Sequence, residues 1–176
     1  HQSVEDIALM RAIPGMVILQ PADATETEKI IFAAAKYEGP VYVRLGRLPV
    51  ADIYNEGYNF EIGKASTLTE GNDVAIIATG LLVGEALKAA ETLKEKGVNV
   101  RVINMSTIKP LDEETVLKAA KECKLVITSE EHSIIGGLGS AVSEFLSSNH
   151  PVKVIRHGIN DVFGQSADGN VMLDKY

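Results

Sequence analysis

The chain has 176 residues, of which 45% are apolar and 23% are charged, and its formal net charge is −7. These proportions are typical of a globular protein rather than a disordered one, and no apolar run approaches the roughly 20 residues that cross a bilayer. The acidic charge argues against nucleic-acid binding, because neutralising phosphates requires a surplus of lysine and arginine.

The cysteine content and the two chain ends indicate where the protein works. Cys123 is the single cysteine, which excludes an intrachain disulfide and fits a reducing compartment. The residues after His1 lack the charged and then apolar pattern of a secretory signal, so we expect a cytoplasmic protein. The chain begins at His1 rather than at a methionine, and no helix is predicted to close residues 174–176. Both ends therefore look cut.

Residues 1–49 follow the order helix, strand, helix, strand. Ser3 and Asp6 can cap a first short helix, and Asp23 with Glu26 forms a capping box for the second. The buried strands are expected at residues 16–19 and 41–44, and the second helix is expected to bury the stripe Ile30, Ile31, Ala34 and Ala35. Two strands cannot bury both faces of a parallel sheet, so this segment is predicted to be a fragment of a domain.

The rest of the chain divides into a linker and a second domain. Residues 50–72 are punctuated by Gly and Asn and follow Pro49, which indicates a surface linker, with one short strand expected near residues 60–62. From residue 73 to residue 176, strands and helices alternate. We expect strands at residues 73–79, 98–103, 125–128 and 152–155, and helices at residues 82–96, after Asp112, and at residues 140–148. This alternation predicts a mostly parallel open α/β sheet flanked by helices.

Arg44 and Arg47 follow a predicted strand and flank Leu45-Gly46. Ligands gather at the carboxyl ends of strands in open α/β sheets, and two guanidinium groups there could bind a phosphate bidentately. The alternative is that both are solvated surface arginines, and composition alone favours it.

Two further motifs have a structural and a functional interpretation. The turn Gly136-Gly137-Leu138-Gly139-Ser140 could present N–H groups to an anion, but it matches neither of the usual phosphate-binding spacings, so a tight helix entry is the favoured interpretation. Glu130, Glu131 and His132 suggest a metal or acid–base site. However, alternate residues of a strand point to opposite faces, and no second His or Cys lies at ligand spacing. We therefore expect a hydrogen-bonded structural or interface role and no metal site.

Several longer motifs resemble the transketolase family. Residues 1–14, which read HQSVEDIALMRAIP, resemble its T-H-Q-x-x-E-x-x-A-x-x-R-x-x-P segment. The motifs PAD at residues 21–23 and RLGRLP at residues 44–49 are similar to its continuation. The C-terminal domain of the family is resembled by IKPLD at 108–112, EEH at 130–132 and GGLGSAV at 136–142. The motif GINDVFGQS at 158–166 is closer to transketolase than to other thiamine enzymes, particularly to the split kind with a separate C-terminal subunit.

The resemblance implies a fold, a reaction and site residues. It implies a fragment of the pyrimidine-binding domain at residues 1–49, a linker at 50–72, and a transketolase C-terminal domain at 73–176. His1 resembles the histidine that faces thiamine and the sugar, and Arg47 resembles the arginine that holds the substrate phosphate, with Arg44 as its companion. The reaction implied is transfer of a two-carbon ketol unit between ketose and aldose phosphates, with thiamine diphosphate and Mg²⁺, as in the pentose phosphate pathway.

The departures from the family limit what this chain does alone. The glutamate that activates the cofactor lies upstream of the T-H-Q segment in the family, and a separate domain holds the diphosphate and Mg²⁺. We therefore expect this fragment to bind no cofactor by itself, to be inactive alone, and to need an N-terminal diphosphate-binding section in a dimer-based homo-oligomer. The alternatives are 1-deoxy-xylulose-5-phosphate synthase, a 2-oxoacid dehydrogenase E1 β subunit, or a non-catalytic regulatory or interaction domain.

Overall fold

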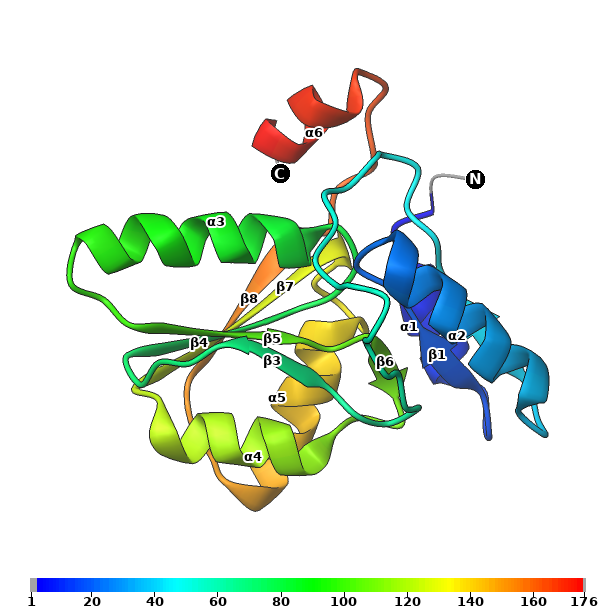
Figure 1. Ribbon diagram of the computed structural model, residues 1–176, viewed down its shortest axis with the longest axis horizontal. Helices are drawn as coiled ribbons and strands as arrows, with labels where there is room; N and C mark the ends of the chain where they lie inside the picture. Colours follow the sequence, from blue (N-terminus) through cyan, green and yellow to red (C-terminus); the bar gives the residue numbers. More distant parts are fainter. Residues whose placement is uncertain (1–2, 176) are drawn as a thin grey trace.

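The computed structural model describes residues 3–175, and within them the chain forms two β-sheets with helices on their faces (Figure 1). The N-terminal α/β fragment lies at the carboxyl ends of the strands of a larger, mostly parallel open sheet. The predicted fold class is therefore confirmed.

The smaller sheet combines strands from both parts of the chain. Its strands are β1 (Val17–Leu19), β2 (Val41–Val43) and β6 (Thr107–Lys109), in the order β2-β1-β6. Strand β1 is parallel to β2 and antiparallel to β6, and it is buried because it lies between them. The sequence does not predict β6. This strand ties the segment 73–176 directly to the N-terminal fragment.

The larger sheet has the order β3-β5-β4-β7-β8. Its strands are β3 (Ser66–Thr69), β4 (Val74–Ala78), β5 (Val100–Asn104), β7 (Leu125–Ser133) and β8 (Val154–Ile159). All neighbours are parallel except β3 and β5. The expectation of a short strand near residues 60–62 is wrong. Strand β3 lies instead near the end of the predicted linker. Its antiparallel pairing gives the outer side of β5 a hydrogen-bonded neighbour.

Helices cover both faces of the larger sheet. Helix α3 (Leu82–Glu95) lies on one face, and α4 (Glu113–Glu122) and α5 (Leu138–Asn149) lie on the other (Figure 1). Side chains of a strand alternate between faces. Accordingly Ile77 and Ile103 pack in the α4 and α5 layer, whereas Ile76 and Val102 pack in the α3 layer.

The N-terminal fragment has the same layered arrangement on a smaller scale. Helix α1 (Asp6–Arg11) packs Ile7 against Ile18, and α2 (Ala24–Lys36) packs Ile30 against the opposite face of β1. The predicted stripe on α2 is too wide, since Ile31 is 45% exposed. A sheet of three short strands can cover only the narrow band around Ile30 and Ala34.

Side-chain caps explain where α2 and α4 begin. Asp23 accepts the N–H of Glu26 at 2.7 Å, as its predicted cap requires. The return bond differs from a capping box, because Glu26 accepts the N–H of Ala22, the residue before the N-cap, at 2.8 Å. Asp112 accepts the N–H of Thr115 at 3.0 Å at the start of α4, which also confirms its predicted cap.

Two expectations about the chain ends are wrong. The predicted cap from Ser3 and Asp6 does not form, because Asp6 binds Tyr42 and Arg44 instead and the N-cap residue Glu5 makes no side-chain capping bond. A short helix, α6 (Gly169–Lys175), closes the C-terminal segment, and its Leu173 packs against the α3 layer. Among the described residues, no helix has the length and apolar composition needed to cross a bilayer.

Candidate functional site

The structure gives the two arginines after β2 different surroundings. The side chain of Arg44 is 10% exposed, and its Nε lies 3.0 Å from Asp6 Oδ2. Its Nη2 donates to the carbonyls of Ser3 and Glu131, both at 3.0 Å, and its Nη1 lies 3.6 Å from Glu131 Oε2. Arg44 therefore joins α1, β2 and β7, and these protein acceptors occupy its guanidinium.

Arg47 is exposed and makes no hydrogen bond or ion pair with any other described residue. Its neighbours Gly46 and Leu48 line an open pocket of about 460 Å³. The remaining lining comes from the start of α2 and from the chain around Leu45, Pro49, Val50 and Leu81. The guanidinium of Arg47 is thus available to an anion, and the residues on either side of Arg47, though not Arg47 itself, line a hollow that follows β2. The assignment of Arg44 and Arg47 to substrate binding stays a prediction, with Arg47 the residue that is free to do it.

His1, the predicted catalytic residue, lies outside the described residues. The described chain begins at Ser3, whose carbonyl is held by Arg44. The structure therefore brings Arg44 to the segment that follows His1, and it leaves Arg47 separate from this contact.

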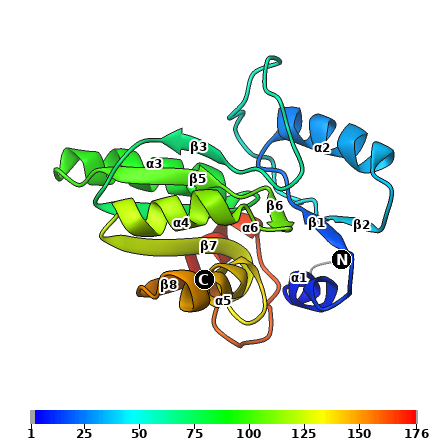
Figure 2. The same ribbon diagram turned by 90° about the horizontal axis from the view of Figure 1, so that it is seen from below.

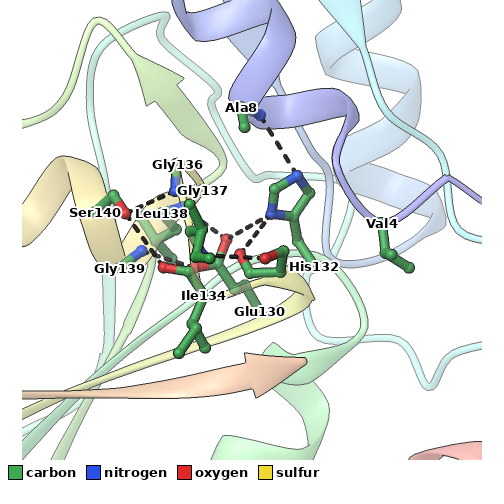
Figure 3. A network of polar contacts seen from close by, with 12 residues as sticks. Val4, Ala8, Glu130, His132, Ile134, Gly136, Gly137, Leu138, Gly139 and Ser140 are labelled. Atoms are coloured by element: carbon green, nitrogen blue, oxygen red, sulfur yellow. Dashed lines mark hydrogen bonds and ion pairs between the residues drawn. The ribbon is translucent and has the colours of Figure 1, made fainter. Parts of the chain in front are cut away.

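The glycine-rich turn before α5 is bound by a carboxylate from its own chain (Figure 3). Glu130 Oε2 accepts the N–H of Leu138 at 2.6 Å, and Glu130 Oε1 accepts the N–H of Gly139 at 2.8 Å. The N-terminus of a helix favours such an anion through its free N–H groups and its dipole. Glu130 thus takes the place that an external phosphate would need, which argues against an anion-binding role for this turn.

The glycines of the turn are required by close packing. A Cβ on Gly137 would lie 2.0 Å from Glu130 Oε2. Gly136 has a φ of +80°, and a Cβ there would lie 2.5 Å from the Cβ of Ala8 in α1. The expected tight helix entry is therefore confirmed, and it brings α1 of the N-terminal fragment against the turn.

Alternation along β7 separates the residues of the EEH motif. Glu130 and His132 are both buried on one side, whereas Glu131 lies on the other side beside Arg44. Burial raises the pKa of Glu131, and the nearby Arg44 opposes this rise. The hydrogen-bonded structural role expected for the motif is confirmed, since each of its residues connects two elements.

A second buried polar cluster was not predicted. Glu26, which is fully buried, accepts both the Asn104 amide and the Tyr58 hydroxyl, and Asp23 Oδ2 accepts the N–H groups of Ile53 and Tyr54 at 2.7 Å. The capping box is a local signal for two of these residues. No sequence signal connects them to Asn104 or to the linker, so the cluster emerges only from the fold.

The carboxylates near the pocket are engaged by donors from the chain itself. No three His, Cys, Asp or Glu side chains among residues 3–175 are grouped to hold a metal ion. The buried carboxylates near the pocket, Asp23 and Glu26, are already engaged by N–H, amide and hydroxyl donors.

The half-buried Tyr42 provides a pH test of the contact between α1 and β2. The Tyr42 hydroxyl donates to Asp6 Oδ2 at 2.7 Å, and burial, followed by Asp6, raises the pKa of Tyr42 to about 12. Unfolded tyrosine titrates near pH ~10, so between about pH 10 and 12 the folded state binds more protons and stability falls as pH rises. We expect the stability advantage of the wild type over Tyr42→Phe to shrink across this window in urea unfolding. A difference that stays constant with pH would contradict the assigned contact.

The arrangement of an α/β fragment against an open, mostly parallel sheet defines a two-part section of an α/β protein. Residues 63–176 match the family model of the transketolase C-terminal domain, and residues 1–51 match the transketolase pyrimidine-binding domain. The chain belongs to the transketolase family.

Relatives and a solved structure agree with this membership. The chain is 50% identical to a putative transketolase C-terminal section of Methanocaldococcus jannaschii, over 100% of this chain and 56% of the relative. It is 44% identical to the 6-deoxy-6-sulfo-D-fructose transketolase subunit SqwH of Clostridium sp., over 100% of this chain and 55% of the relative. A 1-deoxy-D-xylulose-5-phosphate synthase of Halothermothrix orenii is 39% identical, over 93% of this chain and 26% of the relative.

The solved structure is that of a split gene transketolase, described as an inactive beta4 tetramer. It superimposes with a TM-score of 0.96 at 46% identity, covering 99% of this chain and 57% of the other. The chain therefore spans slightly more than half the length of the first two relatives and of this structure.

Proposed function

We propose that the chain is part of the C-terminal section of a split transketolase. It works together with an N-terminal section to transfer a two-carbon ketol unit between phosphorylated sugars. The observation that carries this proposal is the whole-chain match to a split gene transketolase, at a TM-score of 0.96 and 46% identity. Thiamine diphosphate, when bound in the assembly, supplies carbanion stabilisation.

The residues of this chain have binding and orienting roles in the proposal. Arg47 binds the phosphate of the sugar, because its exposed guanidinium is free and its chain neighbours Gly46 and Leu48 line a pocket after a strand end. His1 hydrogen-bonds a sugar oxygen, as its resemblance implies. Arg44 holds the segment after His1 rather than binding substrate directly.

The sugar pair is a separate question from the reaction type. The relatives include a transketolase named for a sulfonated fructose, so membership in the pentose phosphate pathway has no support of its own here. An N-terminal partner section is supported by the solved structure, whose protein is split and whose beta chains alone are described as inactive. The cytoplasmic location and the dimer-based oligomer remain predictions.

The test is an assay of the chain combined with its N-terminal section and thiamine diphosphate. We expect two-carbon transfer between sugar phosphates. Decarboxylation of pyruvate without such transfer would overturn the proposal in favour of a 1-deoxy-xylulose-5-phosphate synthase or a dehydrogenase subunit.

The role of Arg47 has its own expected result. Arg47→Gln should raise the KM for a phosphorylated acceptor by about 10- to 100-fold, the range expected for losing a hydrogen bond to a charged group. The KM for an unphosphorylated analogue should stay unchanged, because that analogue lacks the group that the guanidinium binds. An equal rise in the KM for both substrates would show that Arg47 does not bind the phosphate.

A further inference from the structure

Helix α1 is capped by a residue of strand β7, in the larger sheet. The first N–H groups of a helix have no partners within it, and neither Glu5 nor Asp6 caps α1. The N–H of Ala8 donates instead to Nε2 of His132, at 3.4 Å and 124 residues away in the sequence. Figure 3 shows the imidazole of β7 aimed at the first turn of α1.

The hydrogen bonds of His132 determine which ring nitrogen carries the proton. The side chain is fully buried, and its Nδ1 lies 2.7 Å from the carbonyl oxygen of Ser133. A carbonyl can only accept, so Nδ1 carries the proton and Nε2 of the neutral ring presents its lone pair to Ala8. Glu130 Oε2, at 3.8 Å from Nδ1, favours the same arrangement.

Other contacts hold the same segment from both ends. Ser133 donates its N–H to the carbonyl of Val4 at 2.7 Å, and Arg11 Nη1 donates to the carbonyl of Gly136 at 2.8 Å. Arg11 also pairs with Glu144 of α5 at 2.6 Å, and α1 lies beside α5 in Figure 2. Residues 4–11 are thus bound by the C-terminal part of β7 and by the turn that follows it.

We propose that His132 is a positioning residue, which fixes residues 3–8 by capping α1 from the C-terminal domain. His1 precedes Ser3 by two residues, and two residues of chain span at most about 7 Å. Anchoring Ser3, Val4 and Ala8 therefore fixes the point of the described chain to which the segment that carries His1 is joined. The catalytic consequence rests on the proposed function, in which His1 contacts the sugar. The C-terminal domain then acts on the reaction through α1, without itself touching the substrate.

Two substitutions separate the cap from the rest of the imidazole. His132→Gln can place an amide oxygen near the position of Nε2 and so keep an acceptor for Ala8, whereas His132→Asn keeps only a donor near the position of Nδ1. In the intact assembly, hydrogen–deuterium exchange of the peptide covering residues 3–11 should quicken by about 10-fold or more in His132→Asn and stay near wild type in His132→Gln, because exchange requires local opening.

Steady-state kinetics of the same assemblies test whether the cap by His132 affects the reaction. His132→Asn should lower kcat by about 10-fold with little change in KM, since displacing a reacting group by a fraction of an ångström costs rate rather than affinity. His132→Gln should recover most of this loss. A purely structural role would lower the thermal stability of both variants and leave kcat unchanged at temperatures where they are folded.

The outcomes distinguish this proposal from the proposed function. Wild-type exchange in His132→Asn would refute the cap, and faster exchange with an unchanged kcat would refute the positioning role. If the wild-type assembly transfers no ketol unit, the proposed function and the catalytic consequence both fail. The exchange measurement then still confirms or refutes the cap by itself.

Discussion

Replacing Arg44 by methionine is expected to lower the free energy of unfolding by about 3–5 kcal/mol, the range for breaking a buried ion pair by removing one partner. The substitution leaves the carboxylate of Asp6, whose side chain is 12% exposed, with the Tyr42 hydroxyl as its remaining side-chain partner. It also removes the donors that hold the carbonyls of Ser3 and Glu131. Urea unfolding at neutral pH measures the change.

Arg47 provides the matched control for this prediction. It lies three residues further along the chain, is exposed, and makes no hydrogen bond or ion pair with the other described residues. Arg47→Met should therefore change the free energy of unfolding by no more than about 0.5 kcal/mol. Arg44→Lys should recover only part of the loss, because an ammonium cannot reproduce the planar fork that reaches three acceptors. Equal effects of Arg44→Met and Arg47→Met on stability would refute the structural assignment of Arg44.

The contrast between these two arginines shows what the sequence can and cannot predict about the site. Both follow the same strand, and both have the same chemistry. Their difference arises because Asp6 and Glu131, which lie far from Arg44 in the sequence, converge on it alone. Strand-end position is therefore a local signal for a candidate site, whereas engagement by distant partners is not.

The same distinction explains the successes and failures in the fold. The caps by Asp23 and Asp112 are predicted correctly because donor and acceptor lie three residues apart. The cap of α1 is predicted wrongly because its acceptor, His132, lies 124 residues away. Strand β6 is missed because three residues carry too little periodicity, and its pairing with β1 is a tertiary contact.

Removing the carboxylate of Glu130 is expected to lower the free energy of unfolding by a comparable amount. Glu130 lies at the glycine-rich turn before α5, which also contacts helix α1. The side chain is buried and accepts the N–H groups of both Leu138 and Gly139. Glu130→Ala leaves both donors without an acceptor and creates a cavity, which together should cost about 3–5 kcal/mol. Glu130→Gln should cost less, because its amide oxygen can keep one of the two bonds. Glu114→Ala, at an exposed position of α4, is the control and should stay within about 0.5 kcal/mol of wild type.

The pH dependence of the stability difference between the wild type and Glu130→Gln tests whether the folded protein favours the protonated or the ionised carboxyl. Burial raises the pKa of Glu130, although the N–H groups of Gly139 and Leu138 and the charge of Arg11 oppose the rise. An unfolded glutamate titrates near pH ~4.3, so above that pH the folded state binds more protons than the unfolded state until the raised pKa is passed. The stability of the wild type relative to Glu130→Gln, which does not titrate, should therefore fall as pH rises through this window. Urea unfolding at several values between about pH 4 and 7 measures it. A relative stability that rises with pH would instead show that the N-terminus of α5 holds Glu130 as a favoured anion.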